Sequence, residues 1–326
     1  MQISIVVPTL NRPRYLADAL ASLVAQSSGD WEAVVVDDGS DPPVDREWLR
    51  SQLEGREFQL IRHPSPRGVA AAKNAGAAAA CGELITFLDD DDWLEDSAVA
   101  DIQAIYRAHP ELSCLFLGVR MQGIYAEGAR RNQAQALASL LAEAGVREGP
   151  EIFFLGNRLP RVLLQRVPIA LQRPVVRRGV WNLLGGMYED VIFSEPEWAI
   201  KLAMLDGVVL ALTKQPLSVW RTDGQNFASR PEQRLPQMRR GIQARSRLRN
   251  ELAMQLTAHK KMLAATRRDV VGCYLDLIYA DRMAGERNAA FSVLAQGIRR
   301  APSIRYVRQL VALLLPERVL DFWRHR

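Results

Sequence analysis

The chain has 326 residues, of which 48% are hydrophobic and 24% are charged, a composition that excludes a disordered protein and allows one large domain plus an appendage. Its three cysteines, Cys81, Cys114 and Cys273, lie far apart, which argues against a disulfide framework and a clustered zinc site. The net charge of +5 is uneven, because residues 1–220 carry 21 Lys and Arg against 28 Asp and Glu (−7), whereas residues 221–326 carry 21 against 9 (+12).

Strand and helix patterns alternate through the first third of the chain. Short β-rich apolar runs predict strands over Ile3–Val7, Ala33–Val36, Phe58–Ile61 and Leu84–Leu88. Small and apolar residues at helical spacing predict helices over Arg14–Ala25 and Gly68–Ala80. The alternation predicts an α/β fold with a mostly parallel sheet flanked by helices. Ligands of such sheets bind at the carboxyl ends of the strands.

From about Leu112 the sequence pattern is less regular, and beyond Arg230 it is helical. Arg158–Arg178 mixes prolines, arginines and short apolar runs and fits no element. Strands are predicted over Val208–Leu212 and Leu217–Trp220. Helices are predicted over Gln133–Ala144, Glu195–Leu205, Leu235–Leu256, Asp269–Ala284, Glu286–Arg299 and Ile304–Leu315. We therefore expect a main domain over residues 1–228 and a basic α-helical region over residues 229–326.

No targeting or membrane-spanning segment is recognisable in the sequence. The first apolar run, Ile3–Val7, lacks the basic region and the small-residue cleavage site of a signal peptide. No run reaches the roughly 18 apolar residues of a transmembrane helix. We therefore expect a cytoplasmic protein. The four histidines share no constellation and are assigned to packing or to the surface.

Four consecutive aspartates, Asp89, Asp90, Asp91 and Asp92, follow the apolar strand Leu84–Leu88. Adjacent carboxylates repel one another and need solvent, hydrogen-bond donors or a cation. A solvated acidic loop does not explain why an apolar strand leads into them. Clustered hard oxygen ligands suit Mg²⁺ or Mn²⁺ that carries a bound phosphate. The sequence therefore predicts a divalent metal at this strand end.

A second acidic turn, Asp37-Asp38-Gly39-Ser40, follows the neighbouring predicted strand. By itself an Asp-Gly pair is a common turn. Next to the four aspartates the turn is a stronger candidate for a ligand site, because a carboxylate there can accept a hydrogen bond from a nucleobase N–H or a ribose hydroxyl. Neither a Gly-x-Gly-x-x-Gly sequence nor a Walker sequence is present, which disfavours ordinary dinucleotide and P-loop sites.

The four ordered segments Ile5–Arg12, Val36–Ser40, Arg67–Gly76 and Phe87–Asp92 together resemble family 2 glycosyltransferases with the GT-A fold. The resemblance is strong over residues 1–95 and extends through about residue 226. It implies a nucleotide-sugar half over residues 1–110 and an acceptor half over residues 111–228. It also implies an inverting, metal-dependent transfer of a hexosyl-type sugar from a nucleoside-diphosphate donor, usually UDP-linked, to a hydroxyl group.

The resemblance assigns roles to single residues. Thr9 and Arg12 would border the nucleoside, and Asp38 would bind the nucleobase. Lys73 and Asn74 would face the donor diphosphate or base. Asp90 would lie by the ribose. Asp91 would be the metal-binding residue of the D-x-D sequence, with Asp89 and Asp92 supporting it; because the four aspartates are consecutive, the frame is open by one residue.

The family needs a carboxylate base for the acceptor hydroxyl, usually in a Glu-Asp pair that opens a later helix. The sequence Trp198-Ala199-Ile200-Lys201-Leu202 matches that helix and puts Glu195 at the base position, where the family usually has aspartate. Asp190, in the literal Glu-Asp pair, and Glu197 are the alternatives. A structural alternative is that Glu195 only favours the helix dipole.

The resemblance and the basic region together suggest the partners. We expect a glycan or lipid-linked acceptor in bacterial surface polysaccharide or lipopolysaccharide synthesis, and no nucleic acid. The arginines of residues 229–326 form either a solvated helical face or a peripheral contact with anionic membrane, which would lie at its inner face. A nucleotide-sugar-forming nucleotidyltransferase is disfavoured by the loop after the first strand, and an inactive, scaffolding relative is the remaining alternative.

Overall fold

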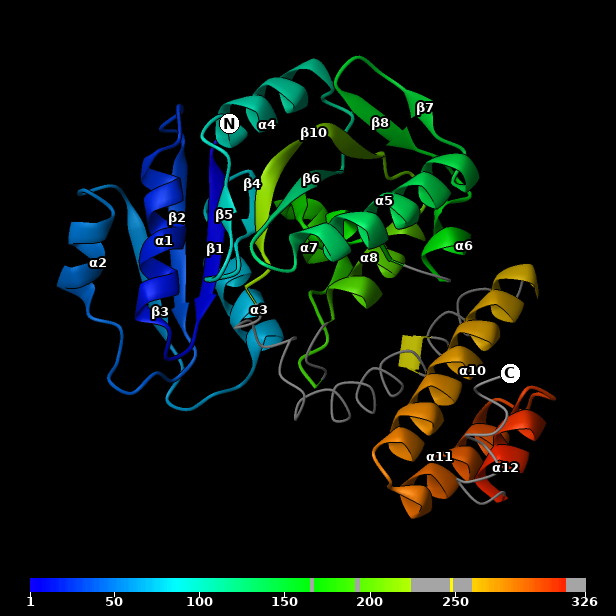
Figure 1. Cartoon of the computed structure of the whole chain (residues 1–326). Coiled ribbons are helices and arrows are strands. Elements are labelled where there is room, and N and C mark those ends of the chain that lie inside the picture. The colour runs from blue at the N-terminus through cyan, green and yellow to red at the C-terminus, as the bar shows by residue number, and fades with distance from the viewer. Residues whose placement is uncertain (165–166, 191–193, 224–246, 249–259, 315–326) are drawn as a thin grey trace. The chain divides into compact units, whose positions relative to one another are not determined.

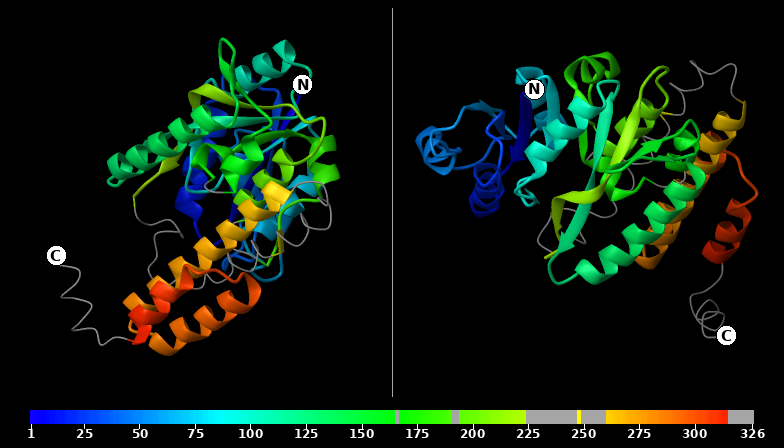
Figure 2. Two further views of the ribbon diagram at one scale, coloured as in Figure 1. Left: turned by 90° about the vertical axis from the view of Figure 1, so that its right-hand side faces the viewer. Right: turned by 90° about the horizontal axis from the view of Figure 1, so that it is seen from above.

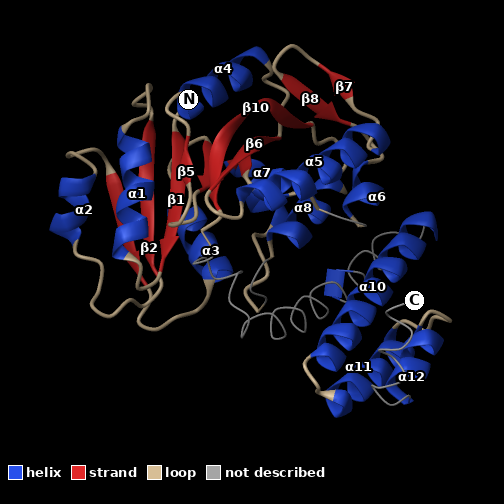
Figure 3. Cartoon of the chain, in the orientation of Figure 1, coloured by secondary structure: helices blue, strands red, loops and turns tan. Residues whose placement is uncertain are grey.

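The computed structural model describes residues 1–164, 167–190, 194–223, 247–248 and 260–314. The chain divides into two compact units, Met1–Ser229 and Arg230–Arg326. In the described ranges every strand lies in the first unit, and the second unit contains helices (Figure 3). None of the helices in these ranges combines the length and the apolar character that crossing a membrane requires. The predicted helix over Leu235–Leu256 lies outside the described residues, apart from 247–248.

Unit 1 is built on a mixed sheet (Figure 1). Its strands are β1 (Ile3–Thr9), β2 (Trp31–Asp37), β3 (Phe58–Arg62), β4 (Leu84–Phe87), β5 (Trp93–Leu94), β6 (Cys114–Gln122), β7 (Arg147–Glu148), β8 (Ile152–Leu155), β9 (Pro174–Arg177) and β10 (Leu210–Arg221). Their order is β3-β2-β1-β4-β9-β6-β10-β8-β7, with β5 paired to β10. The four strands predicted from the first third are parallel to one another, whereas β9 runs antiparallel between β4 and β6.

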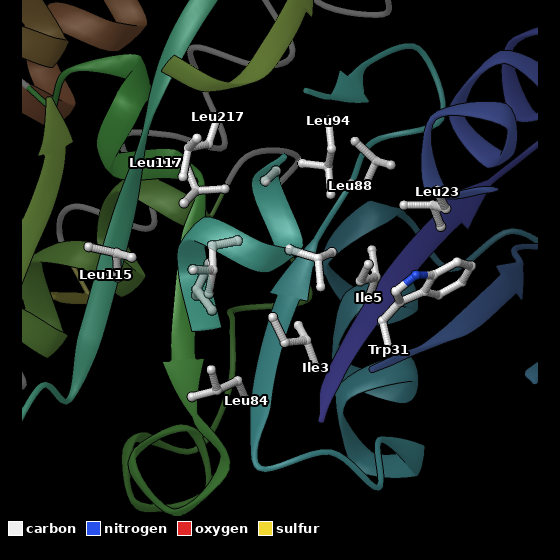
Figure 4. Close-up of a cluster of buried hydrophobic side chains, with 14 of the residues drawn as sticks. Ile3, Ile5, Leu23, Trp31, Leu84, Leu88, Leu94, Leu115, Leu117 and Leu217 are labelled. Atoms are coloured by element: carbon white, nitrogen blue, oxygen red, sulfur yellow. The ribbon is translucent and has the colours of Figure 1, made fainter. Parts of the chain in front are cut away.

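Helices cover both faces of the parallel strands. Alternate residues of β1, among them Ile3, Ile5 and Val7, form one core with helix α1 (Pro13–Val24), helix α2 (Arg46–Gln52) and helix α4 (Ala98–Ala108) (Figure 4). The opposite face packs against α3 (Val69–Ala79). There Gly76 allows a close approach, because a Cβ at this position would lie 2.3 Å from Val6 Cγ1. The polar strand ends are therefore held by helices that are packed on both sides.

The later part of unit 1 completes the sheet and adds further helices (Figure 2). These elements are α5 (Ala126–Glu143), α6 (Leu159–Leu163), the 3₁₀ turn η1 (Ile169–Gln172), α7 (Arg178–Leu184) and α8 (Glu195–Ala203). Two strands were predicted over residues 208–220, and that prediction is wrong, since β10 is continuous. Its pairing with β6 shifts register on both sides of Pro216, and this irregularity absorbs the break in the apolar pattern.

The described helices of unit 2 are α10 (Lys260–Met283), α11 (Arg287–Arg300) and α12 (Tyr306–Leu314). They match the predicted helices after residue 269, with α10 starting earlier. Their shared core contains Tyr274, Ile278, Leu294 and Tyr306. Gly297 lets α11 approach this core, because a Cβ there would lie 2.9 Å from the Tyr306 ring. Unit 2 therefore has a hydrophobic core of its own.

The turn after β2 is organised by Asp37, whose carboxylate is buried. Its oxygens accept hydrogen bonds from the backbone N–H groups of Ser40 (2.8 Å) and Val44 (3.0 Å) and from the Arg62 guanidinium (2.6 Å). Burial alone would raise the pKa of Asp37, but the donors outweigh it and lower that pKa. Asp37 thereby fixes the loop that carries Asp38.

We expect Asp37→Asn to lower the free energy of unfolding at pH 7 by about 1.5–3 kcal/mol, since hydrogen bonds to a charged group are lost. The native carboxyl has a lowered pKa, so its stabilisation is present above the unfolded value and disappears as pH falls through the folded value. The difference between wild type and variant in urea unfolding should therefore shrink below about pH 4. A difference that stays constant down to pH 3 would contradict this account.

Candidate active site

The acidic turn Asp89–Asp92 begins two residues after β4 ends, at the edge of the sheet where β1 and β2 also end. Parallel pairing in register brings Thr9 of β1 and Asp38 after β2 to the same edge, and the Asp38 N–H donates to the Thr9 carbonyl (2.9 Å). The four aspartates do not face one another without compensation. Cationic side chains from three other segments lie among them.

Arg12, in the loop after β1, contacts two of the aspartates. Its Nη1 donates to Asp90 Oδ1 (3.0 Å) and to Asp91 Oδ2 (2.9 Å), and the guanidinium lies over the ring of Tyr15. Thr9 Oγ1 donates to the other oxygen of Asp90 (2.8 Å). Burial raises the pKa of Asp90 to about 6, although Arg12 acts in the opposite direction. The structure thus brings together Thr9, Arg12, Asp90 and Asp91, as the predicted site requires.

Lys73 connects the acidic turn to α8. It lies on α3 with its side chain only 2% exposed, and its Nζ is 2.7 Å from Asp89 Oδ1 and 2.6 Å from Glu195 Oε1. Burial alone would lower the pKa of this amine, but the two carboxylates outweigh it and raise the pKa. The pKa of Asp89 is lowered to about 2, because Lys73 and Arg173 outweigh the effect of burial. Lys73 is therefore a buried cation shared by two predicted functional residues.

Arg173 is a site residue that the sequence did not reveal. It follows η1 in the segment that fitted no predicted element, and it pairs with Asp92 and, at 3.6 Å, with Asp89. Asp92 also accepts from the Arg221 N–H (3.0 Å). Burial raises the pKa of Asp92 to about 7, against the effect of Arg173. Glu195 contributes to the raised pKa of Arg173, so the guanidinium also lies in the electrostatic field of this carboxylate.

Glu195 opens α8, and its side chain is 8% exposed. One carboxylate oxygen binds Lys73, whereas Oε2 is buried and accepts no hydrogen bond from the described residues. A buried carboxylate oxygen without a donor is uncommon and marks a position where a ligand group can bind. Of the two residues predicted as alternative bases, Glu197 is buried within the same helix and Asp190 is exposed.

Asp38 binds its own chain through both carboxylate oxygens. Its Oδ1 lies 2.6 Å from His63 Nδ1 and accepts from the Arg67 N–H (3.0 Å), and its Oδ2 accepts from the Gly68 N–H (2.8 Å). Its carboxylate thus binds the chain immediately before α3. His63 is buried, and this polar pairing is a contact that the sequence did not predict. Asp38 therefore joins the turn after β2 to the start of α3.

Asn74 anchors the segment before α8 rather than the acidic turn. Its side-chain amide donates to the Met187 carbonyl (2.9 Å) and accepts from the Met187 N–H (2.9 Å). It also donates to Glu189 (3.0 Å), which binds Arg67 through its other oxygen (2.9 Å). Gly186 has φ +77, and a Cβ there would lie 2.8 Å from the Asn74 carbonyl oxygen, so a glycine is needed at this position.

The contacts of the four aspartates decide which of them can bind a metal ion. Among the described residues, no set of three His, Cys, Asp or Glu side chains is arranged to hold an ion. Mg²⁺ needs only one or two carboxylates when substrate phosphates complete its shell. Asp91 fits this mode: burial and the nearby Asp89 raise its pKa, so its charge would be stabilised by a cation. Asp92 fits less well, because its oxygens already bind Arg173 and Arg221.

Comparison with known proteins agrees with this geometry. Residues 4–150 match the family model described as Glycosyl transferase family 2. The chain is 33% identical over 130 residues to the O-antigen biosynthesis protein RfbC of Myxococcus xanthus, an alignment that covers 39% of this chain and 10% of that protein. It is 41% identical over 95 residues to an uncharacterized glycosyltransferase of Nostoc sp., covering 28% and 29%. The chain thus spans less than a third of the length of these two relatives.

Solved structures share the fold over a longer range. Residues 1–349 of TarS from S. aureus give a TM-score of 0.59 at 17% identity, covering 93% of this chain and 81% of that one. The mannosyltransferase PcManGT of Pyrobaculum calidifontis, in complex with GDP-Man and Mn²⁺, gives a TM-score of 0.54 at 17% identity, covering 100% and 88%. The predicted α/β fold of GT-A type, with a central sheet flanked by helices, is confirmed. Residues 4–150 of this chain are therefore similar to glycosyl transferase family 2, and the whole of unit 1 has the GT-A type of fold.

Proposed function

We propose that the protein transfers a sugar from a nucleoside-diphosphate donor to a hydroxyl group of a glycan or lipid-linked acceptor. The family match supports the reaction class, and the relative named for O-antigen biosynthesis supports a bacterial surface polysaccharide or lipopolysaccharide as product. Solved TarS structures in complex with UDP and with UDP-GlcNAc support a UDP-linked donor. Because PcManGT is in complex with GDP-Man, a GDP-linked donor is the alternative to compare.

The observation that carries the proposal is the carboxylate of Glu195. Its Oε1 binds Lys73, which also binds Asp89 of the acidic turn, and its Oε2 is buried and accepts no hydrogen bond from the part of the chain that the structure describes. An acceptor hydroxyl that donates to this oxygen would complete its hydrogen bonding. Glu195 then takes the proton as the hydroxyl oxygen attacks the anomeric carbon. General-base catalysis of this kind contributes roughly 10²–10⁴ in rate. A single displacement with the base opposite the leaving diphosphate inverts the anomeric configuration.

Three cations of the chain hold the charges in place. Lys73 pairs with Glu195 and Asp89, and Arg173 pairs with Asp92 and Asp89. Arg12 pairs with Asp90 and Asp91. These groups are preorganised, since they are paired before any ligand arrives, so little reorganisation accompanies the reaction. Under this proposal the protein supplies a base together with fixed ion pairs that hold the acidic turn beside it.

Donor binding is proposed at the ends of β1, β2 and β4. Thr9 and Arg12 border the nucleoside, Asp38 faces the nucleobase through its remaining acceptor capacity, and Asp90 lies by the ribose. Lys73 and Asn74 lie beside the proposed donor site, where Lys73 holds Asp89 and Asn74 holds the segment before α8. Their contacts support positioning roles for both side chains.

We propose Asp91, with Asp89 beside it, as the ligand of a Mn²⁺ or Mg²⁺ ion whose remaining positions are filled by the donor diphosphate. Such an ion would supply Lewis-acid stabilisation of the departing diphosphate. Asp92, the second predicted ligand, would have to exchange Arg173 for the ion, so its contacts support a role in holding Arg173. The location at the inner face of the membrane, and the membrane contact expected from the basic region, are separate proposals because they depend on unit 2.

Calorimetric titration with UDP, with and without Mn²⁺, tests the donor site. We expect binding that requires Mn²⁺, and Asp91→Asn should weaken it by roughly tenfold or more, since one charged ligand of the ion is lost. Asp96→Asn is the matched control, because Asp96 is exposed four residues beyond the acidic turn. GDP and dTDP serve as comparators. Absence of binding to all three nucleotides in folded protein would favour the inactive, scaffolding alternative.

A further inference from the structure

Helix α12 of unit 2 carries an exposed apolar face. Its inner side buries Tyr306 and Leu313 in the core shared with α10 and α11. Its outer side carries four exposed aliphatic side chains, Val307, Leu310, Val311 and Leu314, and Ile304 is exposed in the turn just before the helix; the exposed fractions lie between 38% and 83%. The spacing of three and four residues places the four helical side chains on one stripe of α12. We call these five residues the α12 face. A continuous apolar stripe of this kind marks an interaction surface.

Exposed arginines accompany the α12 face, and acidic residues are missing from this stretch of sequence. The 28 residues from Arg287 to Leu314 contain five arginines and neither Asp nor Glu. Arg299, Arg300, Arg305 and Arg308 are exposed. Arg308 lies about 60° around the helix from Val311, so its guanidinium borders the apolar stripe. This stretch of unit 2 therefore combines exposed apolar side chains with exposed arginines and carries no carboxylate of its own.

The positive charge beside the α12 face distinguishes between its two simplest partners, a second copy of this chain and an anionic lipid surface. In a two-fold dimer each copy would bring the same arginines to the same interface, and like charges placed together oppose association. An anionic lipid surface offers complementary groups to both parts of the face: acyl chains to the aliphatic side chains and negative headgroups to the arginines.

We propose that the α12 face docks unit 2 on an anionic lipid surface. The aliphatic side chains enter the boundary between headgroups and acyl chains, and Arg305 and Arg308 remain at the level of the headgroups. Neither feature suffices alone, since stable peripheral binding takes an apolar and an electrostatic contribution together. The proposal concerns unit 2 only and stands independently of the reaction assigned to unit 1. It adds a lipid partner, and the residues that contact it, to the proposed function.

Vesicle sedimentation with the full chain tests the proposal. We expect binding to vesicles of phosphatidylcholine mixed with phosphatidylglycerol and little binding to phosphatidylcholine alone. The double variant Val307→Glu/Val311→Glu should lower the partition coefficient roughly tenfold or more, because it removes apolar contacts and adds negative charge. Arg305→Gln and Arg308→Gln should each lower it about fivefold at low salt, with a smaller effect at high salt.

The control variant is Leu183→Glu, because Leu183 is 73% exposed on α7 of unit 1 and lies outside the α12 face. It should leave vesicle binding unchanged. Circular dichroism and thermal unfolding of each variant show that the fold persists, as expected for substitutions at exposed positions. Three results would overturn the proposal: no binding to anionic vesicles, equal binding by the Val307/Val311 variant, or self-association in solution that this variant abolishes without any lipid binding.

Discussion

Glu195→Gln is expected to lower turnover by roughly 10²–10⁴-fold while leaving nucleotide binding close to that of the wild type. Glutamine keeps the size of the side chain and can still hydrogen-bond to Lys73, but its amide cannot take a proton from the acceptor. The loss should therefore appear in kcat and not in the affinity for UDP. Steady-state transfer assays together with UDP titration separate the two quantities.

Two neighbouring carboxyl groups provide the controls for this assignment. Asp190→Asn removes an exposed carboxylate and Glu197→Gln a buried one within α8. Both variants should keep turnover within a few-fold of wild type. A loss confined to Asp190→Asn, with Glu195→Gln nearly active, would move the base to the Glu-Asp pair before α8. Equal losses in Glu195→Gln and Glu197→Gln would point to a structural requirement for the start of this helix.

The parallel half of the fold was predictable because its signals are local. Buried parallel strands read as short apolar runs, and each is followed at once by the polar residues that it positions. Parallel pairing then implies that Thr9, Asp38 and Asp91 meet at one edge, whichever helices lie between. The structure brings these residues to that edge. Their chemical roles remain predictions, which the titrations and variants above address.

The second half of the site was not predictable, because its contacts join distant segments. Arg173 lies among prolines and other arginines without periodicity, so nothing in the sequence distinguishes it from Arg177 or Arg178. Its role arises only because β9 inserts between β4 and β6 and brings η1 beside the acidic turn. The pairing of His63 with Asp38 likewise depends on the register of β3 against β2.

Lys73 shows how the two halves depend on each other. Sequence places it on a helix after the third strand and suggests contact with the donor. In the structure its ammonium group is buried between Asp89 and Glu195, so it joins the parallel half to α8. Burying one cation between two carboxylates is stabilising only while all three remain paired, since removal of one partner leaves uncompensated buried charge. The arrangement therefore links fold stability to the geometry of the base.

Lys73→Met is expected to lower the free energy of unfolding at pH 7 by about 3–5 kcal/mol and to reduce turnover as well. The matched control is Lys214→Met, because Lys214 pairs with an exposed glutamate and should cost at most about 1 kcal/mol. The double variant Lys73→Met/Glu195→Gln should recover part of the stability, since one of the two stranded charges is gone. Urea unfolding of the four proteins measures these differences.

The pH dependence of the Lys73→Met effect distinguishes lost charge pairing from lost packing. In the wild type the pKa of Asp89 is lowered to about 2, so its stabilisation is present above the unfolded value and fades as pH falls from about 4 towards 2. In the variant that stabilisation is largely absent, and the stranded carboxylates become neutral as they protonate. The gap between wild type and Lys73→Met should therefore narrow steadily as pH falls from 7 towards 3. A gap that is independent of pH would mean that Lys73 acts through the packing of its aliphatic chain, and the proposed link between the acidic turn and the base would fail.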